Sequence, residues 1–200
     1  MQRWATFDCY GTLIDWNGGI QSELEPEVEQ DGSLPYKVVL TETLIRLAED
    51  EGLSMPEGES DALVKALPTW EPFPEVPDSL DELRRRGWNL VILSNSDRDL
   101  ITESMKRIGV PFDLAIVAGD LGSYKPAHAH WEHFYDVTTA DKEHHVHVAA
   151  SLFHDIAPAR ELGLKTVWIN RLGEKPEPKP DRELTDLAEL PDTLDDLVPA

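Results

Sequence analysis

An apolar strand ends on Asp8 and turns at a glycine in the stretch Thr6-Phe7-Asp8-Cys9-Tyr10-Gly11-Thr12-Leu13-Ile14-Asp15. A carboxylate at the carboxyl end of a buried strand is held rigid and faces the crevice in which open α/β sheets bind ligands. In that position it can act as a covalent nucleophile. The simpler alternative is that Asp8 only caps the following turn, as the aspartate of many Asp-x-x-Gly sequences does.

The rest of the chain favours the first interpretation, because apolar runs that end in polar residues recur along it. Strands are predicted over 4–7, 90–93, 114–118, 146–150 and 166–169. Helical patterns separate the later runs, over 79–86, 99–108, 127–137 and 158–162, and Gly87, Gly109 and Gly163 stand where helix C-caps are expected. This alternation predicts a doubly wound, mostly parallel, Rossmann-like α/β sheet covered on both faces.

One interval breaks the alternation. Between Leu13 and about Phe73 the chain has no strand signal, and it offers acidic, helix-compatible segments over 19–29, 36–51 and 60–67. The pattern predicts a small helical cap, residues 15–72, inserted after the first strand. The α/β core then comprises residues 1–14 and 73–200, with an exposed loop over 173–180 and a short acidic closing segment over 184–197.

The composition sets the broad class of the protein. The 39 acidic and 18 basic residues give a net charge of −21, which excludes a large nucleic-acid face and repels anionic membranes. No apolar run approaches the roughly 18 residues of a membrane helix, and we expect no signal segment. The single cysteine excludes an internal disulfide and favours a cytoplasmic location. Two explanations of the acidic surface stay open, a high-salt habitat and a merely acidic protein.

Polar side chains follow the predicted strands at one edge of the sheet, where the fold brings their loops together. The predicted catalytic residues are Asp8, Thr12, Ser94, Asn95, Lys125 and Asp155. Lys125 can hold a nucleophilic carboxylate ionised and also collect a substrate anion. Ser94 and Asn95 can donate to substrate or leaving group. Asp155 can bind the lysine or orient a water, and a helix N-cap role is equally open.

Four other residues are candidates for substrate binding: Cys9, Tyr10, Trp16 and His154. Strand alternation turns Cys9 away from the face of Asp8, so a packed core thiol is its simpler interpretation. Trp16 borders the insertion together with Trp70, where hinge packing is the alternative to an aromatic substrate wall. The other histidines are predicted to be surface or packing residues and not a metal cluster: His128, His130, His133, His144, His145 and His147.

The motifs, taken in order over roughly residues 4–171, resemble those of the haloacid dehalogenase superfamily. They are Phe7-Asp8-x-Tyr10-Gly11-Thr12-Leu13, Leu93-Ser94-Asn95, Lys125-Pro126 and Ser151-Leu152-Phe153-His154-Asp155. The first and last look most like the type II 2-haloacid dehalogenase branch and its hydrolase relatives. The resemblance implies a hydrolase whose helical cap follows the first motif.

For this branch the resemblance implies displacement at carbon, on a small carboxylate substrate and without a required metal. Asp8 attacks C2 of a short 2-halocarboxylate, expels halide and becomes an aspartyl ester. Water held by Asp155 or its neighbours then hydrolyses the ester. Lys125 and Ser94 fix Asp8 and the substrate carboxylate, and Asn95 offers an N–H to the halide.

Position 10 separates this chain from the phosphatase members that it resembles. Those enzymes usually carry a second aspartate two residues after the nucleophile, and Tyr10 stands there. Without that acid, phosphoester turnover is expected to fall on the order of 10²–10⁴-fold. Asp8 and Asp155 can still bind Mg²⁺ together, so a Mg²⁺-dependent small-molecule phosphatase is the enzyme alternative.

The substrate stays open. Arg46 is the only arginine of the predicted cap, and no halide-binding motif surrounds it. Ala150 and Leu152 stand where the dehalogenases carry Ser and Asn. Relatives with the same last motif include hydrolases that open the ring of azetidine-2-carboxylate, for which His154 can supply a proton. An inert binding protein is the non-enzyme alternative, and we expect a monomer or a homodimer.

Overall fold

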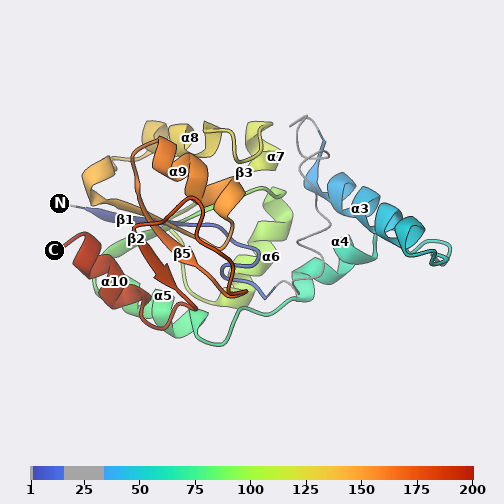
Figure 1. Ribbon diagram of the computed structural model, residues 1–200, viewed down its shortest axis with the longest axis horizontal. Coiled ribbons are helices and arrows are strands. Elements are labelled where there is room, and N and C mark those ends of the chain that lie inside the picture. The colour runs from blue at the N-terminus through green and yellow to red at the C-terminus, as the bar shows by residue number, and fades with distance from the viewer. Residues whose placement is uncertain (1, 16–33) are drawn as a thin grey trace.

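The computed structural model describes residues 2–15 and 34–200, and one six-stranded sheet lies at its centre (Figure 1). The strands follow the order β3-β2-β1-β4-β5-β6, and every neighbouring pair is parallel. Their bounds are β1 Arg3–Phe7, β2 Trp88–Ser94, β3 Leu114–Val117, β4 His145–Ala149, β5 Lys165–Ile169 and β6 Arg182–Leu184. This is the order of a doubly wound sheet, so the predicted Rossmann-like fold is confirmed.

Helices cover both faces of the sheet, because its strands are apolar on both sides. The core helices are α5 (Val76–Arg85), α6 (Arg98–Ile108), α7 (Ala118–Leu121), α8 (Ala129–Val137), α9 (Ala157–Glu161) and α10 (Leu190–Leu197). Apolar residues of α5, α6 and α10 share one core cluster with Ala5 and Phe7 of β1, and those of α8 and α9 share the other with Trp4. In Figure 1, α5 and α10 accordingly lie across the sheet from α8 and α9. Within residues 2–15 and 34–200, no helix combines the length and the apolar character needed to span a bilayer.

Two short elements, α7 and β6 (Arg182–Leu184), were not predicted from the sequence. The helix α7 is a single turn that follows β3 directly, so the strand predicted through residue 118 ends at Val117. The strand β6 is a mostly exposed edge strand of three residues that pairs with β5 through main-chain hydrogen bonds, which require no apolar run. The other predicted strands and helices of the core are present with small shifts at their ends. Gly109, for example, ends α6 in the left-handed conformation at φ 74°.

The described part of the insertion between β1 and α5 contains two α-helices joined by turns. It contains α3 (Tyr36–Asp50) and α4 (Ala62–Ala66), close to two of the predicted segments. The helix predicted over 19–29 lies outside the described residues. In Figure 1, α3 extends away from the sheet. Tyr36, Val39 and Leu40 in its first half belong to the main core cluster. The division into a cap of residues 15–72 and a separate core stays a prediction.

The start of α3 is held by a residue of the core. Asp97, which follows β2, accepts hydrogen bonds from the backbone N–H groups of Tyr36 and Lys37 at 3.3 and 3.1 Å. N–H groups in the first turn of a helix have no intrahelical acceptor, so the carboxylate of Asp97 supplies the missing acceptor. Tyr124 adds a second link, because its hydroxyl donates to the carbonyl of Leu34 at 2.7 Å.

Buried histidines tie the stability of the core to pH. His130 on α8 is fully buried, and its Nε2 lies 3.1 Å from the carbonyl oxygen of Ser94. A carbonyl can only accept, so Nε2 carries a proton. Burial, assisted by the positive charge of Lys125, lowers the pKa of His130 to about 4. These contacts agree with the predicted packing role of this histidine.

The free energy of unfolding is expected to fall as the pH is lowered from about 6.5 to about 4. In this window the unfolded chain binds a proton at residue 130 and the folded chain does not, so added protons favour unfolding. The contribution of this one group is on the order of 3 kcal/mol. Urea unfolding across the window tests it against His130→Gln, whose amide can keep the bond to Ser94 without titrating. The variant should show the flatter pH dependence, and parallel curves would contradict the assigned proton state.

Candidate active site

A buried lysine joins two carboxylates at the carboxyl edge of the sheet. Nζ of Lys125 donates to Oδ1 of Asp8 at 3.0 Å and to Oδ1 of Asp155 at 2.6 Å. Its third hydrogen bond goes to the carbonyl of Leu93 at 2.8 Å. An ammonium has three donors, so all three are used inside the protein. The predicted partnership of Lys125 with Asp8 is confirmed. Its expected second task, to collect a substrate anion, stays a prediction.

The sheet order explains why these groups meet. Asp8 directly follows β1, and Asp155 lies in the π-helical turn Leu152–Ile156 after β4. The strands β1 and β4 are neighbours in the sheet, although β2 and β3 come between them in the sequence. Doubly wound sheets place their sites at such switch points. Ser151 caps the turn by accepting from the N–H of His154, so the N-cap role considered for Asp155 is wrong.

Thr12 holds the second oxygen of Asp8. Its Oγ1 donates to Oδ2 of Asp8 at 2.9 Å and accepts from the N–H of Ala150 at 2.9 Å. The chain can return to Asp8 in this way because Gly11 adopts φ 83°, a conformation that side chains with a Cβ rarely take. Both oxygens of Asp8 are therefore oriented by fixed donors.

The two carboxylates differ in access and in the direction in which their pKa values shift. The Asp8 side chain is 13% exposed and that of Asp155 only 1%. Burial raises the pKa of Asp8, against the lowering effect of Lys125. Burial alone would also raise the pKa of Asp155, but Lys125 and His147 outweigh it and lower that pKa to about 2. Burial opposes the charge of Lys125 as well, yet its two carboxylate partners raise its pKa. Asp155 is thus the permanent counter-charge, and Asp8 is the carboxylate that a small molecule can reach.

Asn95 positions the lysine from the neighbouring strand end. Its Oδ1 accepts from the backbone N–H of Lys125 at 2.6 Å, and its Nδ2 donates to the backbone carbonyl of Lys125 at 2.8 Å. The side chain therefore holds the main chain of the lysine. The expected N–H contact of Asn95 with a leaving group stays a prediction. Ser94 is buried beside it, and its carbonyl accepts from His130.

Three of the predicted substrate-binding residues, Tyr10, Cys9 and His154, lie in the described part of the chain. The hydroxyl of Tyr10 meets Oγ of Ser104 at 3.1 Å, burial raises its pKa, and its ring stacks on Tyr36. Cys9 has no exposed surface and burial raises the pKa of its thiol, so it is the packed core residue that alternation suggested and not a substrate contact. The Nδ1 of His154 lies 3.2 Å from Oγ of Ser151, within its own turn.

Three further residues considered from the sequence are Trp16, Arg46 and Trp70. Trp16 lies outside the described residues. Arg46 is exposed on α3. Trp70 packs edge-on against Tyr10 with 6.4 Å between ring centroids, in keeping with the hinge packing considered for it.

Two functional contacts were missed from the sequence. Nε2 of His147 lies 3.0 Å from Oδ1 of Asp155, and the polar positions 145 and 147 within an apolar strand were a signal that could have identified it. Arg171, after β5, donates to the carbonyl of Thr12 at 3.0 Å and to Glu75 at 2.6 Å, so it ties together the two ends of the insertion. A lone arginine after the last apolar strand gave no comparable signal.

The carboxylate pair is a poor fit for Mg²⁺. Oδ1 of Asp155 already accepts hydrogen bonds from Lys125 and His147, and the same ammonium faces Asp8. A hard cation requires several oxygen ligands that are free to turn towards it. Over residues 2–15 and 34–200, no group of three or more His, Cys, Asp or Glu side chains is arranged to hold a metal. No step through Mg²⁺ follows from these residues.

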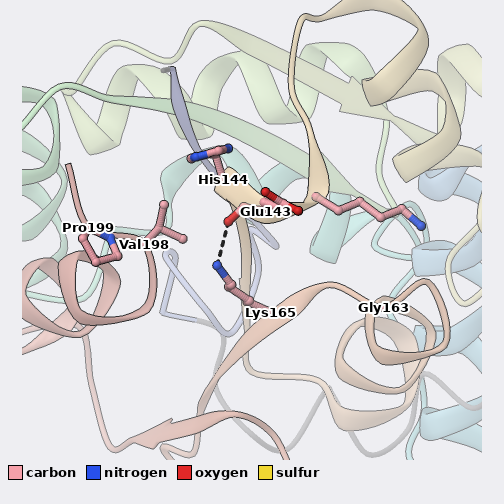
Figure 2. A pocket seen from close by; sticks show the side chains of 7 residues that line it. Glu143, His144, Gly163, Lys165, Val198 and Pro199 are labelled. Carbon is pink, nitrogen blue, oxygen red and sulfur yellow. Dashed lines mark hydrogen bonds between the residues drawn. The ribbon is translucent and has the colours of Figure 1, made fainter.

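A cavity of about 490 Å³ lies at the opposite edge of the sheet (Figure 2). Its lining comes from the turn before β4, the start of β5 and the end of the chain: Lys142, Glu143, His144, Gly163, Lys165, Val198 and Pro199. Nζ of Lys165 donates to the carbonyl of Glu143 at 2.6 Å, as the dashed line in Figure 2 marks. The cavity contains none of the predicted site residues, so it is separate from the site at Asp8.

Comparison with known proteins assigns the family. The model of haloacid dehalogenase-like hydrolases matches residues 7–169. The chain is 34% identical over 141 residues to the (S)-2-haloacid dehalogenase of Pseudomonas sp. strain YL, which covers 68% of this chain and 60% of that protein. It is 29% identical over 156 residues to the phosphoserine phosphatase of Thermus thermophilus, covering 74% and 63%. Both matches therefore span less than two thirds of the relative's length.

A solved structure extends the likeness over the whole fold. The L-2-haloacid dehalogenase from Xanthobacter autotrophicus with chloropropionic acid covalently bound gives a TM-score of 0.83 at 18% identity, covering 97% of this chain and 98% of that one. The chain belongs to the haloacid dehalogenase-like hydrolases.

Proposed function

We propose that this protein hydrolyses the carbon–halogen bond of a small 2-halocarboxylate, with Asp8 as the covalent nucleophile. An oxygen of Asp8 forms a bond to C2 while the carbon–halogen bond breaks, and the halide leaves with the electron pair. Water then adds to the carbonyl carbon of the aspartyl ester, and the product leaves as a 2-hydroxycarboxylate. One proton of the water goes to the departing oxygen, and the other is released when Asp8 ionises again.

The unequal exposure of the two carboxylates is the observation that carries the proposal. Asp8 is the accessible member of the pair, with its two oxygens held by Lys125 and Thr12. Asp155 is closed off behind the lysine and keeps it charged. A nucleophile fixed in this way loses little orientational freedom in the attack, which is a main source of rate in displacement reactions.

A halide is the proposed leaving group because Tyr10 is not placed to protonate one. A departing alkoxide or amine needs a proton, and a departing halide does not. Tyr10 stands where the resembling phosphatases carry an acid, but its hydroxyl points to Ser104 and burial raises its pKa. This disfavours phosphoester chemistry even though a phosphoserine phosphatase is among the relatives. It also disfavours the opening of azetidine-2-carboxylate, unless His154 provides the proton.

The names of the relatives support the same chemistry. The Pseudomonas protein is an (S)-2-haloacid dehalogenase, and the Xanthobacter protein holds chloropropionic acid covalently. We carry over to this chain a small carboxylate as substrate and independence from metal. The further parts of the proposal are a helical cap over residues 15–72, a cytoplasmic location and a monomer or homodimer.

A single turnover in H₂¹⁸O is expected to place the heavy oxygen in Asp8. The protein, in excess over 2-chloropropionate, is digested afterwards, and the peptide that contains Asp8 is analysed by mass spectrometry. Ester hydrolysis at the aspartyl carbonyl leaves the label on the enzyme and unlabelled oxygen in the product. Asp8→Asn, which keeps the shape of the side chain, should give neither label nor product.

Other results of this experiment would point elsewhere. Label found only in the 2-hydroxycarboxylate would contradict the ester intermediate. Turnover of a phosphate ester that EDTA abolishes would favour the phosphatase alternative. No turnover of 2-chloropropionate, azetidine-2-carboxylate or a phosphate ester would favour the inert binding protein.

Replacing the lysine is expected to separate stability from activity. Lys125→Met leaves two carboxylates without their cation, which should lower the free energy of unfolding by about 3–5 kcal/mol and turnover by at least about 100-fold. Adding Asp155→Asn removes one of the two buried charges, so stability should recover in part while turnover stays low. Denaturant unfolding and steady-state kinetics of both variants check this. A double variant that regains activity would show that the lysine has no role in the reaction.

A further inference from the structure

A chain of hydrogen bonds runs beneath the site, from Asp155 through β1 and β4 to Tyr135 on α8. Oδ1 of Asp155 meets Nε2 of His147 at 3.0 Å, and Nδ1 of His147 meets Oγ1 of Thr6 at 2.8 Å. The same Thr6 oxygen meets Nε2 of His145 at 2.7 Å, and Nδ1 of His145 meets the hydroxyl of Tyr135 at 2.6 Å. Thr6, His145 and His147 are fully buried, and Tyr135 at the outer end is partly exposed.

With neutral rings, only one set of hydrogen positions satisfies every link. The ionised Asp155 can only accept, so Nε2 of His147 donates and its Nδ1 accepts from the hydroxyl of Thr6. Thr6 has then used its hydrogen and must accept from Nε2 of His145, whose Nδ1 accepts from Tyr135. Every donor in the chain therefore points towards Asp155. Burial holds the pKa of His145 well below its ordinary value, which agrees with a neutral ring at that link.

Core packing alone does not explain the polar side chains of this hydrogen-bonded chain. Thr6 and His147 are partners in the register of β1 and β4, on the face that Trp131 of α8 covers. Strands buried on both faces are usually apolar, because a buried polar group is costly unless it is fully hydrogen-bonded. Replacement of such a set by apolar groups is often neutral for stability. The feature that distinguishes this set is its connection to Asp155.

We infer that His147, held in place by Thr6 and His145, is a positioning residue for the reaction at Asp8. His147 and Lys125 bind the same oxygen of Asp155, so the histidine fixes the carboxylate that fixes the ammonium. That ammonium in turn orients the attacking oxygen of Asp8. The inference rests on the proposed function for its kinetic consequence, but the proton positions can be tested without any substrate.

The first test reads the tautomer directly. ¹⁵N NMR of the imidazole nitrogens in the folded protein at neutral pH should find His147 neutral, with its proton on Nε2. Thr6→Val removes the hydroxyl and should shift the Nδ1 resonance of His147, while Thr6→Ser should restore it. A His147 ring protonated at Nδ1, or at both nitrogens, would overturn the chain whether or not the protein is a dehalogenase.

The second test is kinetic and uses 2-chloropropionate. Thr6→Val and His147→Leu should each lower kcat on the order of tenfold with little change in KM, because the nucleophile is misaligned and the substrate contacts remain. Thr6→Ser and His147→Gln, which keep a donor at the same place, should recover most of the rate. An unchanged kcat per folded molecule in His147→Leu would overturn the inference.

Thr166→Val provides the matched control. Thr166 on β5 is the register partner of His147 on the other side, is fully buried, and donates to Asp181 at 3.0 Å and not to the chain. Loss of the Thr166 hydroxyl should lower the free energy of unfolding and leave kcat unchanged. If Thr166→Val lowers kcat as much as Thr6→Val does, the effect is one of general packing and the inference is overturned. If the wild type does not act on 2-chloropropionate while NMR finds the expected tautomer, only the proposed function fails.

Discussion

The site depends on one ammonium shared between two carboxylates of unequal access. The Lys125 side chain is almost fully buried, and its ammonium donates hydrogen bonds to Asp8, Asp155 and the carbonyl of Leu93. A buried cation is tolerated only when its charge and its donors are fully compensated. The sheet order supplies that compensation by bringing the ends of β1 and β4 side by side. One carboxylate then neutralises the lysine permanently, and the other stays available for chemistry.

Much of this could be predicted from the sequence, because the strands of a parallel sheet have a strong apolar signal and their ends a polar one. Asp8, Lys125 and Asp155 were placed at the same edge from their positions after apolar runs, and the structure brings them within hydrogen-bonding distance. Thr12 was assigned to the same group and contacts Asp8. The motifs that carry the family resemblance lie in these same loops, and the family match covers them.

The rest could not be predicted, because sequence position does not reveal how many donors and acceptors a side chain has already used. Lys125 was expected to bind a substrate anion, and the structure shows its three donors engaged by Asp8, Asp155 and the carbonyl of Leu93. Asn95 was expected to face the leaving group, but its amide is engaged by the backbone of Lys125. The edge strand β6 has no apolar run. The strand histidines 145 and 147 were predicted as surface or packing residues, and the sequence did not show that both are fully buried and hydrogen-bonded.

The loop after β2 makes two attachments within three residues. Asn95 grips the main chain of Lys125, and Asp97 holds the first turn of α3. A displacement of α3 would therefore break bonds formed by a segment that also holds the main chain of Lys125. The position of the insertion helix and the alignment of Lys125 are thus coupled through one short loop of the core.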